Sequence, residues 1–266
     1  MKHPRLQNPR GVRPAPIVWI LAGAALAALA PAAEPGRAME RERFALEVEA
    51  GPLWQTRNDV RIPNETGTEF SLADAAGGGP WGVHRVEADI NINDRHGFRA
   101  VWAPIDIEET AMFDTEVRFS GEDFEPGVET GANYKFSSYR FTYRYRFYDG
   151  PTWSWQVGGT AFIRDARIAL RQGELSAEDT DVGFVPLAYL QGEARLGDRW
   201  RFHLDFEGLG APQGRAFDLA ARMGYGLSDH WELAFGYRTI EGGVDVDRVY
   251  NFAWLHLAMA SLRFCY

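Results

Sequence analysis

Hydrophobic and polar residues alternate along most of the chain. From Tyr139 to Phe147, aromatic side chains occupy every second position and polar side chains separate them. The same period of two runs through the segments that contain Val86, Trp200 and Trp231. In a β-strand this period places apolar side chains on one face and polar side chains on the other. The pattern therefore predicts an all-β, antiparallel chain with strands near 43–55, 81–93, 97–109, 134–148, 152–170, 185–196, 200–209, 215–226, 230–240 and 250–266.

The connections between these strands alternate in length. Short turns at 93–97, 149–152, 197–199 and 227–230 alternate with mostly longer polar or Gly-rich stretches at about 56–80, 111–133, 171–184, 209–215 and 241–249. This alternation is typical of an up-and-down barrel with short turns at one end and long loops at the other. Ten strands fit best, and eight or twelve remain possible because the third segment is interrupted by Pro104. An even number places both ends of a barrel at 43–266 on the side of the short turns.

The apolar face is too bulky for the inside of a small barrel. Five aromatic rings from 139–147 alone would overfill a narrow lumen, whereas rings turned outward into lipid meet no such limit. This bulk argues against a soluble barrel with an apolar interior. The opposite face carries charges of both signs, which can pair inside a lumen and so offset their desolvation. We therefore expect a transmembrane β-barrel with a lumenal charge network of Glu47, Glu49, Arg85, Glu87, Asp89, Arg140, Arg144, Glu193, Arg195, Arg201, Asp205, Glu207, Arg222, Glu232 and Arg238.

Aromatic residues cluster where the predicted strands end. Such residues favour the two interfaces of a bilayer, because one part of the ring system is apolar and another is polar. Two belts with an aliphatic band between them are predicted. The aromatic girdle comprises Trp153, Trp155, Trp200 and Trp231 at the short turns, and Trp54, Trp81 and Tyr250 at the long loops.

The first 32 residues have the composition of a cleaved signal peptide. Four basic residues precede the apolar run Ile17–Ala30, and small residues follow it at Ala30 and Ala32. An uncleaved membrane anchor is the alternative, and a lipoprotein anchor is excluded because the chain's one cysteine is Cys265. Residues 33–42 would then form a short periplasmic segment.

Removal of this peptide takes away four basic residues and no acidic one, so the net charge changes from −9 to −13. An acidic protein of this kind repels nucleic acid. No internal disulfide is possible with one cysteine, and the sequence indicates no metal site and no cofactor.

The end of the chain resembles that of bacterial outer-membrane barrels. The segment from His256 to Tyr266 alternates up to a terminal aromatic residue, with Leu262, Phe264 and Tyr266 on one face. It is similar to the C-terminal signal of those proteins, which implies recognition by the barrel assembly machinery. The segment 225–233 resembles the turn and strand of small OmpA-like barrels. The resemblance implies an outer-membrane location among lipid and lipopolysaccharide. The oligomeric state stays open, with a monomer expected.

One group of residues has the composition of a catalytic site. His203, Asp205 and Glu207 share the polar face of one strand, where a carboxylate could orient the imidazole as a general base. The alternative is a structural role for all three in the lumenal charge network, and we favour this interpretation. His256 falls on the predicted lipid face and has no serine two residues away on that face.

Three functions are compatible with this sequence. The favoured one is a non-enzymatic outer-membrane barrel, with a charge-filled lumen and external loops that support the membrane or contact a partner or ligand. The second is a narrow pore for small ions or solutes. The third is an enzyme that modifies lipids or peptides. Paired lumenal charges favour the first over the second.

Overall fold

The computed structural model describes residues 42–266. The expected signal peptide at 1–32 and all but the last residue of the segment at 33–42 lie outside the described residues. The elements are β1 (Phe44–Arg61), β2 (Phe70–Ser71), α1 (Leu72–Ala76), β3 (Trp81–Asn91), β4 (His96–Ala103), β5 (Asp106–Ala111), β6 (Val117–Phe119), β7 (Glu122–Phe124), β8 (Thr130–Asp149), β9 (Trp153–Gln172), β10 (Leu175–Arg195), β11 (Trp200–Ala211), β12 (Gly214–Gly226), β13 (Trp231–Val246) and β14 (Val249–Cys265). Within this range no helix has the length and apolar character needed to cross a bilayer.

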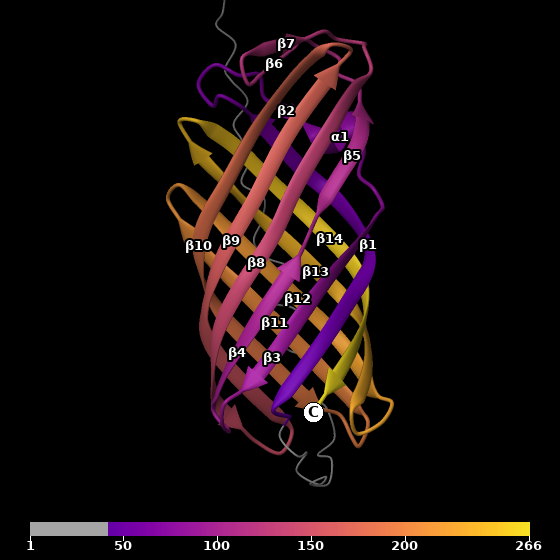
Figure 1. Cartoon of the computed structure of the whole chain (residues 1–266), viewed down its shortest axis with the longest axis vertical. Coiled ribbons are helices and arrows are strands. Elements are labelled where there is room, and N and C mark those ends of the chain that lie inside the picture. The colour runs from indigo at the N-terminus through magenta and orange to yellow at the C-terminus, as the bar shows by residue number, and fades with distance from the viewer. Residues whose placement is uncertain (1–41) are drawn as a thin grey trace, which may run out of the picture. The chain divides into compact units, whose positions relative to one another are not determined.

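The strands form one closed antiparallel barrel, as Figure 1 shows. Neighbouring strands follow the order β1, β3, β4, β8 and then β9 to β14, and β1 pairs with β14 to close the ring. The closing pair runs from Ala45 opposite Cys265 to Arg61 opposite Tyr250. The predicted ten-stranded up-and-down barrel is confirmed. We call the end with the short turns the turn end, and the end with β6 and β7 the loop end.

The third predicted strand is split at Pro104. β4 and β5 both pair with β8, and the amide of Phe136 donates to the carbonyl of Ile105 (2.8 Å) between them. Proline has no amide hydrogen, so it breaks a ladder at the point where it stands. The strand direction nevertheless continues from β4 into β5.

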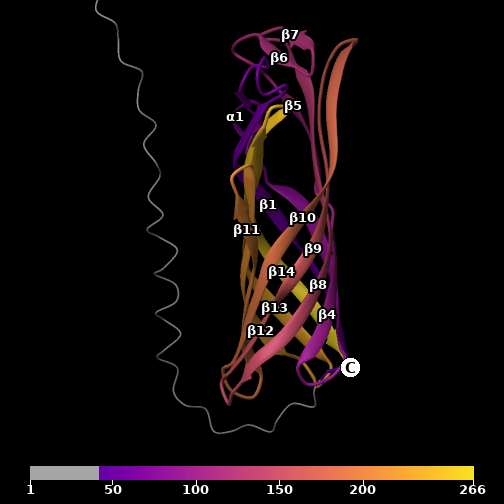
Figure 2. The same cartoon turned by 90° about the vertical axis from the view of Figure 1, so that its left-hand side faces the viewer.

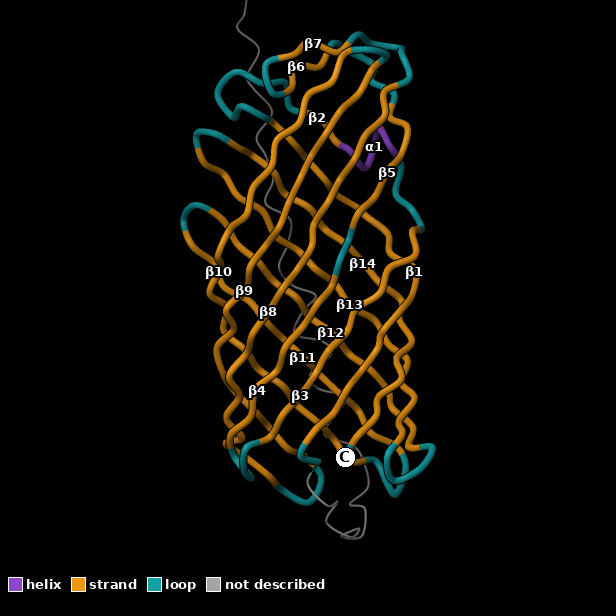
Figure 3. Tube along the Cα trace, viewed as in Figure 1, coloured by secondary structure: helices purple, strands orange, loops and turns teal. Residues whose placement is uncertain are grey.

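Several predicted loops are strands in the structure. The stretches at 171–184 and 241–249 belong almost wholly to β9, β10, β13 and β14, and β1 continues to Arg61. Only tight turns remain at the tips (Figure 3), and Gly173, with φ of 60°, supplies the left-handed backbone of one of them. The prediction of loops was wrong here because polar outward residues were taken as a sign of irregular structure.

The two faces of the strands exchange character along the barrel. Near the turn end of β8, Phe141 and Tyr143 point outward and Arg140 points inward. Nearer the loop end of the same strand, Tyr134 is buried inside and Lys135 points outward, where its ammonium pairs with Asp165 (2.6 Å). The apolar side chains are thus outside in one half of the barrel and inside in the other.

An apolar core fills part of the loop-end interior. The side chains of Leu53, Val60, Phe119, Phe124 and Leu170 are fully buried there. Helix α1 and the β6–β7 hairpin cover this core, as Figure 1 shows. The loop end of the barrel is therefore packed like a soluble domain.

Candidate functional site

A network of ion pairs crosses the turn-end half of the lumen. Arg99, on β4, contacts Asp89 and Glu87 of β3 at 2.9 Å each, and Asp205 of β11 at 3.0 Å. Its side chain is 2% exposed. Asp205 also accepts from Arg222 of β12 at 2.7 Å. Because β4 and β11 are not neighbours in the sheet, this chain of contacts spans the interior from wall to wall.

The same network extends along the barrel toward the loop end. Arg238 donates to Glu49 (3.2 Å) and to Asp218 (2.7 Å), and Arg140 pairs with both Asp218 (2.7 Å) and Glu207. Every member is almost completely buried. Buried charges persist only where partners satisfy them, and these partners come from opposite walls. We call this set the charge plug: Glu47, Glu49, Arg85, Glu87, Asp89, Arg99, Arg140, Arg144, Asp205, Glu207, Asp218, Arg222 and Arg238.

The structure places most of the predicted lumenal charges in this plug. Three others lie nearer the turn end, where they are half-buried: Arg195 pairs with Asp149, Arg201 pairs with Glu232, and Glu193 also faces inward. Glu232 itself is buried and holds His203.

Sequence reasoning missed Arg99, Asp218 and Arg263. Arg99 pairs with Asp89, and Arg263 pairs with Asp89 and Glu47. Each missed residue lies in phase with the inward face of its strand, as Asp218 does four positions before Arg222. Extending the period of two from Arg222 would have found Asp218, and alternation with the apolar residues Phe98 and Phe264 would have found Arg99 and Arg263.

The candidate catalytic group is not assembled as a unit. Asp205 is bound by Arg99 and Arg222, and Glu207 is bound by Arg140. His203 instead contacts Glu232 through Nε2 at 2.8 Å, and its side chain is buried. The predicted partners of the imidazole are therefore used as ion-pair partners within the plug.

His256 lies on the outward face of β14, as its phase predicted. Its imidazole contacts the hydroxyl of Thr56 through Nε2 at 2.8 Å and the hydroxyl of Tyr237 through Nδ1. The ring also stacks on Tyr237 and lies against Trp254. These contacts tie β1, β13 and β14 together on the outside of the barrel seam.

The residues predicted for the aromatic girdle lie in different surroundings. Trp153, Trp155, Trp200 and Trp231 lie at the turn end, and Trp54 lies on the outward face of β1. Trp81 shares the inward phase of Arg85 on β3 and packs against the apolar core, so its assignment to the girdle was wrong. Tyr250 lies nearer the loop end than Trp54. There its hydroxyl accepts a hydrogen bond from Arg57 (3.1 Å), among charged side chains.

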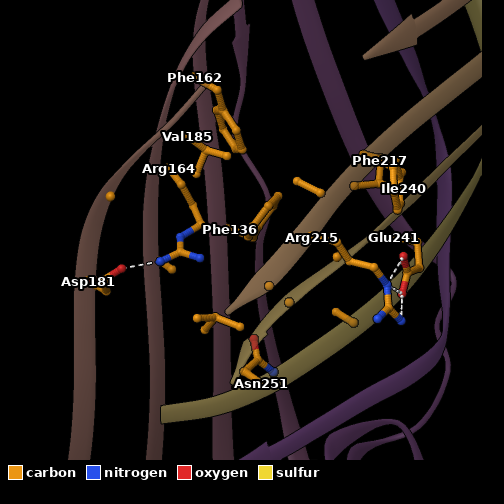
Figure 4. A pocket seen from close by; sticks show the side chains of 18 of the residues that line it. Phe136, Phe162, Arg164, Asp181, Val185, Arg215, Phe217, Ile240, Glu241 and Asn251 are labelled. Atoms are coloured by element: carbon orange, nitrogen blue, oxygen red, sulfur yellow. Dashed lines mark hydrogen bonds and ion pairs between the residues drawn. The ribbon is translucent and has the colours of Figure 1, made fainter. Parts of the chain in front are cut away.

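A cavity of about 430 Å³ lies above the charge plug, between β8–β10 on one side and β11–β14 on the other. Its wall is mostly apolar, and Figure 4 shows Phe136, Phe162 and Val185 facing Phe217 and Ile240 across it. Members of the plug line its floor. The size is within the range of about 300–1,000 Å³ that is common for small-molecule sites.

Two ion pairs are among the polar groups that line this cavity. The Arg164–Asp181 pair joins β9 to β10, and Arg215 holds Glu241 through two nitrogens, at 2.9 and 2.6 Å. The pairs lie on opposite sides of the cavity (Figure 4). A site of this kind can hold an apolar body and orient a polar end by hydrogen bonds.

Residues 42–266 contain no group of three or more His, Cys, Asp or Glu side chains placed to hold a metal ion.

No protein-family model and no curated protein sequence matches the chain. Solved structures with a similar arrangement of strands include the outer-membrane protease OmpT of Escherichia coli, at a TM-score of 0.47 and 9% identity, covering 86% of this chain and 99% of that one. The translocator domain of the autotransporter NalP from Neisseria meningitidis is similar at a TM-score of 0.44 and 8% identity, covering 85% and 90%. Ail of Yersinia pestis follows at 0.36 and 10% identity, covering 84% and 100%.

Proposed function

We propose that the protein is an integral outer-membrane barrel that neither conducts ions nor catalyses a reaction, and that it presents its loop end for contact with a ligand or partner. The charge plug carries this proposal. Side chains from opposite walls meet across the lumen in the Arg99–Asp205, Arg140–Glu207 and Arg140–Asp218 pairs, and these buried ion pairs fill the lumen at that height. A barrel of about this strand number has an interior that side chains can fill.

The outward faces support the membrane location. Exposed aromatic and aliphatic side chains form the outside of the turn-end half, while charges fill its inside. This arrangement is stable in lipid and unfavourable in water. The protein would lie among outer-membrane lipid and lipopolysaccharide as a monomer, after export and insertion by the barrel assembly machinery.

The position of His203 supports the absence of catalysis. A general base must reach its substrate, and this imidazole is buried at 3% exposure beneath the plug residues that form the cavity floor. On the outside, the imidazole of His256 contacts the hydroxyls of Thr56, Tyr237 and Thr239, and no carboxylate of the described residues orients it.

Bilayer conductance tests the sealed lumen. We expect the purified protein to run on a gel as a compact barrel whose mobility changes only after boiling. In a bilayer it should give no stable conductance steps. Removing both partners of a cross-lumen pair, in an Arg99→Ala/Asp205→Ala variant, should open a small conductance if it still folds. The matched control removes the exposed pair Arg118–Asp123 of the β6–β7 hairpin and should stay silent.

Stable conductance steps from the unmodified protein would contradict the sealed lumen and favour the pore. A protein that is water-soluble and shows no shift on boiling would contradict the membrane location.

A further inference from the structure

The cavity above the plug is open on one side of the barrel wall. Strands β10 and β11 pair only from Ala188 opposite Gly208 to Arg195 opposite Arg201. The rest of β10, from Leu175 to Leu187, has no strand partner on that side. Figure 2 views this side, where the β9–β10 hairpin rises apart from the shorter β11–β12 hairpin. The lining of the cavity comes from both edges of this opening.

Apolar side chains border the opening on both of its edges. Phe184 of β10 is 67% exposed and Leu209 of β11 is 43% exposed, and both also line the cavity. The barrel registers place Phe184 opposite Ile163, and Ile163 opposite Tyr139. Phe184 therefore continues the row of outward apolar side chains that Tyr139 and Ile163 form on β8 and β9. The opening adjoins the lipid-facing surface at its upper edge, so the cavity and that surface are continuous.

The way to the cavity from the loop end is narrowed by contacts above it. Arg248, in the β13–β14 turn, reaches across to β10 and contacts Asp179 (3.4 Å) and Asp181 (3.3 Å). The hydroxyl of Ser120, beside the β6–β7 hairpin, donates to the carbonyl of Glu178 (3.0 Å). Among the described residues, no ion pair joins Leu175–Leu187 of β10 to the β11–β12 hairpin across the side opening. The side opening therefore gives a molecule from the surrounding lipid a way to the cavity that these contacts do not cross.

The charges around the cavity restrict the polar end of its occupant. Four arginines and five carboxylates line it, which gives a formal charge of −1: Arg140, Arg164, Arg167, Arg215, Asp179, Asp181, Glu207, Asp218 and Glu241. Arg140, Arg164 and Arg215 are paired with carboxylates, and Arg167 donates to Asn133. A strongly anionic group would find no excess of positive charge. A neutral or zwitterionic group can hydrogen-bond to the paired side chains without breaking them.

We propose that this cavity binds the apolar chain of a single-chain amphiphile with a neutral or zwitterionic head, which arrives from the outer leaflet through the opening between β10 and the β11–β12 hairpin. The proposal rests on the proposed function, since it requires lipid around this part of the barrel. The chain lies between Phe136, Phe162 and Ile240, and the head lies beside the Arg164–Asp181 pair.

Photolabelling in lipid vesicles tests this site. The full chain is reconstituted with a trace of lysophosphatidylcholine that carries a diazirine in its acyl chain. The sample is irradiated, and the labelled residues are identified by mass spectrometry. We expect label on inward cavity residues such as Phe162 and Ile240. An Ala166→Trp variant fills the cavity from β9 and should lower that label by about tenfold, since it removes the apolar contacts that hold the chain.

The control variant is Ala161→Trp, which adds the same ring to the outward face of the same strand and should leave the cavity label unchanged. Label confined to outward residues such as Phe141 and Ile163 would overturn the proposal, because it would reflect lipid contact alone. Equal cavity label in both variants would also overturn it. A lysophosphatidate probe with the same diazirine should label the cavity several-fold less, and equal labelling would overturn the head-group assignment.

The same preparation is tested for its shift on boiling and for conductance. A compact, silent barrel without cavity label contradicts the amphiphile site and leaves the proposed function in place. A conducting or soluble protein contradicts the proposed function first.

Discussion

Toward the turn end, the barrel holds ion pairs inside and aromatic rings outside, whereas toward the loop end it holds Phe119 and Leu170 inside and charged side chains outside. The backbone is the same in both halves, since the β8–β9, β9–β10 and β1–β14 pairings run through both. In the proposed function the two halves differ in the solvent that they meet, which is lipid at the turn end and water at the loop end. The comparison then teaches that the position of the face exchange along a strand marks the boundary between lipid and water.

The polarity of the barrel interior depends on the polarity of the exterior for a physical reason. A strand whose outward residues must be apolar has its polar residues left for the inside, where only ion pairs satisfy them. Where the outside is aqueous, the inside can pack as an ordinary hydrophobic core. The charge plug and the apolar core are thus two solutions to filling one barrel.

The largest expected effect is at the centre of the charge plug. Asp205→Ala leaves Arg99 and Arg222 without one of their carboxylates in a buried site, so the free energy of unfolding should fall by about 3–5 kcal/mol. The same deletion at Asp123, which forms an exposed pair with Arg118 at the loop end, should cost about 0–1 kcal/mol. Urea titrations of both variants in vesicles measure the difference. Equal losses would show that the plug is hydrated like a surface.

The apolar core gives the complementary comparison. Phe119→Ala removes a fully buried ring and should lower the free energy of unfolding by about 3–5 kcal/mol. Phe141→Ala removes a ring that is 55% exposed on the turn-end exterior, where lipid replaces the lost contacts, and its effect should be much smaller. The same titration measures both. A larger loss at Phe141 would indicate that this ring packs against protein rather than lipid.

A charge placed on the outside locates the boundary between the halves. Phe141→Arg puts a guanidinium in the predicted lipid band and should cost about 2–4 kcal/mol. Thr180→Arg puts it on the outward face of β10 near the loop end, where water surrounds Thr180, and should cost less than about 0.5 kcal/mol. Similar losses in the free energy of unfolding at both positions would contradict the assignment of lipid to the turn-end half alone.

Sequence alternation was sufficient for the barrel and for most of the plug. Arg140, Asp205 and Arg222 were recognised because each lies between apolar residues whose direction was clear. The loop-end strands were missed because they carry polar residues on their outward face, so residues such as Glu178 and Thr180 were taken as loop residues.

The cavity could not be predicted from the sequence. It depends on the unequal heights of the β9–β10 and β11–β12 hairpins, and the lengths of hairpins at the loop end were not readable from polarity. Its ion pairs join residues of different strands, and cross-strand register is set by the whole barrel. The pairing of Arg248 with β10 likewise depends on where two turns come to lie.

The seam between β1 and β14 has a consequence for the order of folding. It joins residues such as Thr56 and His256, which are 200 positions apart, whereas the other neighbours are hairpins or nearer in sequence. Closing so long a loop costs roughly 3 kcal/mol more than closing a four-residue turn, at about 0.6 kcal/mol for each doubling of length. The seam is therefore the slowest pairing to nucleate and the last to form. Until then the growing sheet has two unpaired edges, and lipid offers neither of them a hydrogen bond. A chaperone that holds those edges until they meet would remove the main kinetic obstacle to this barrel.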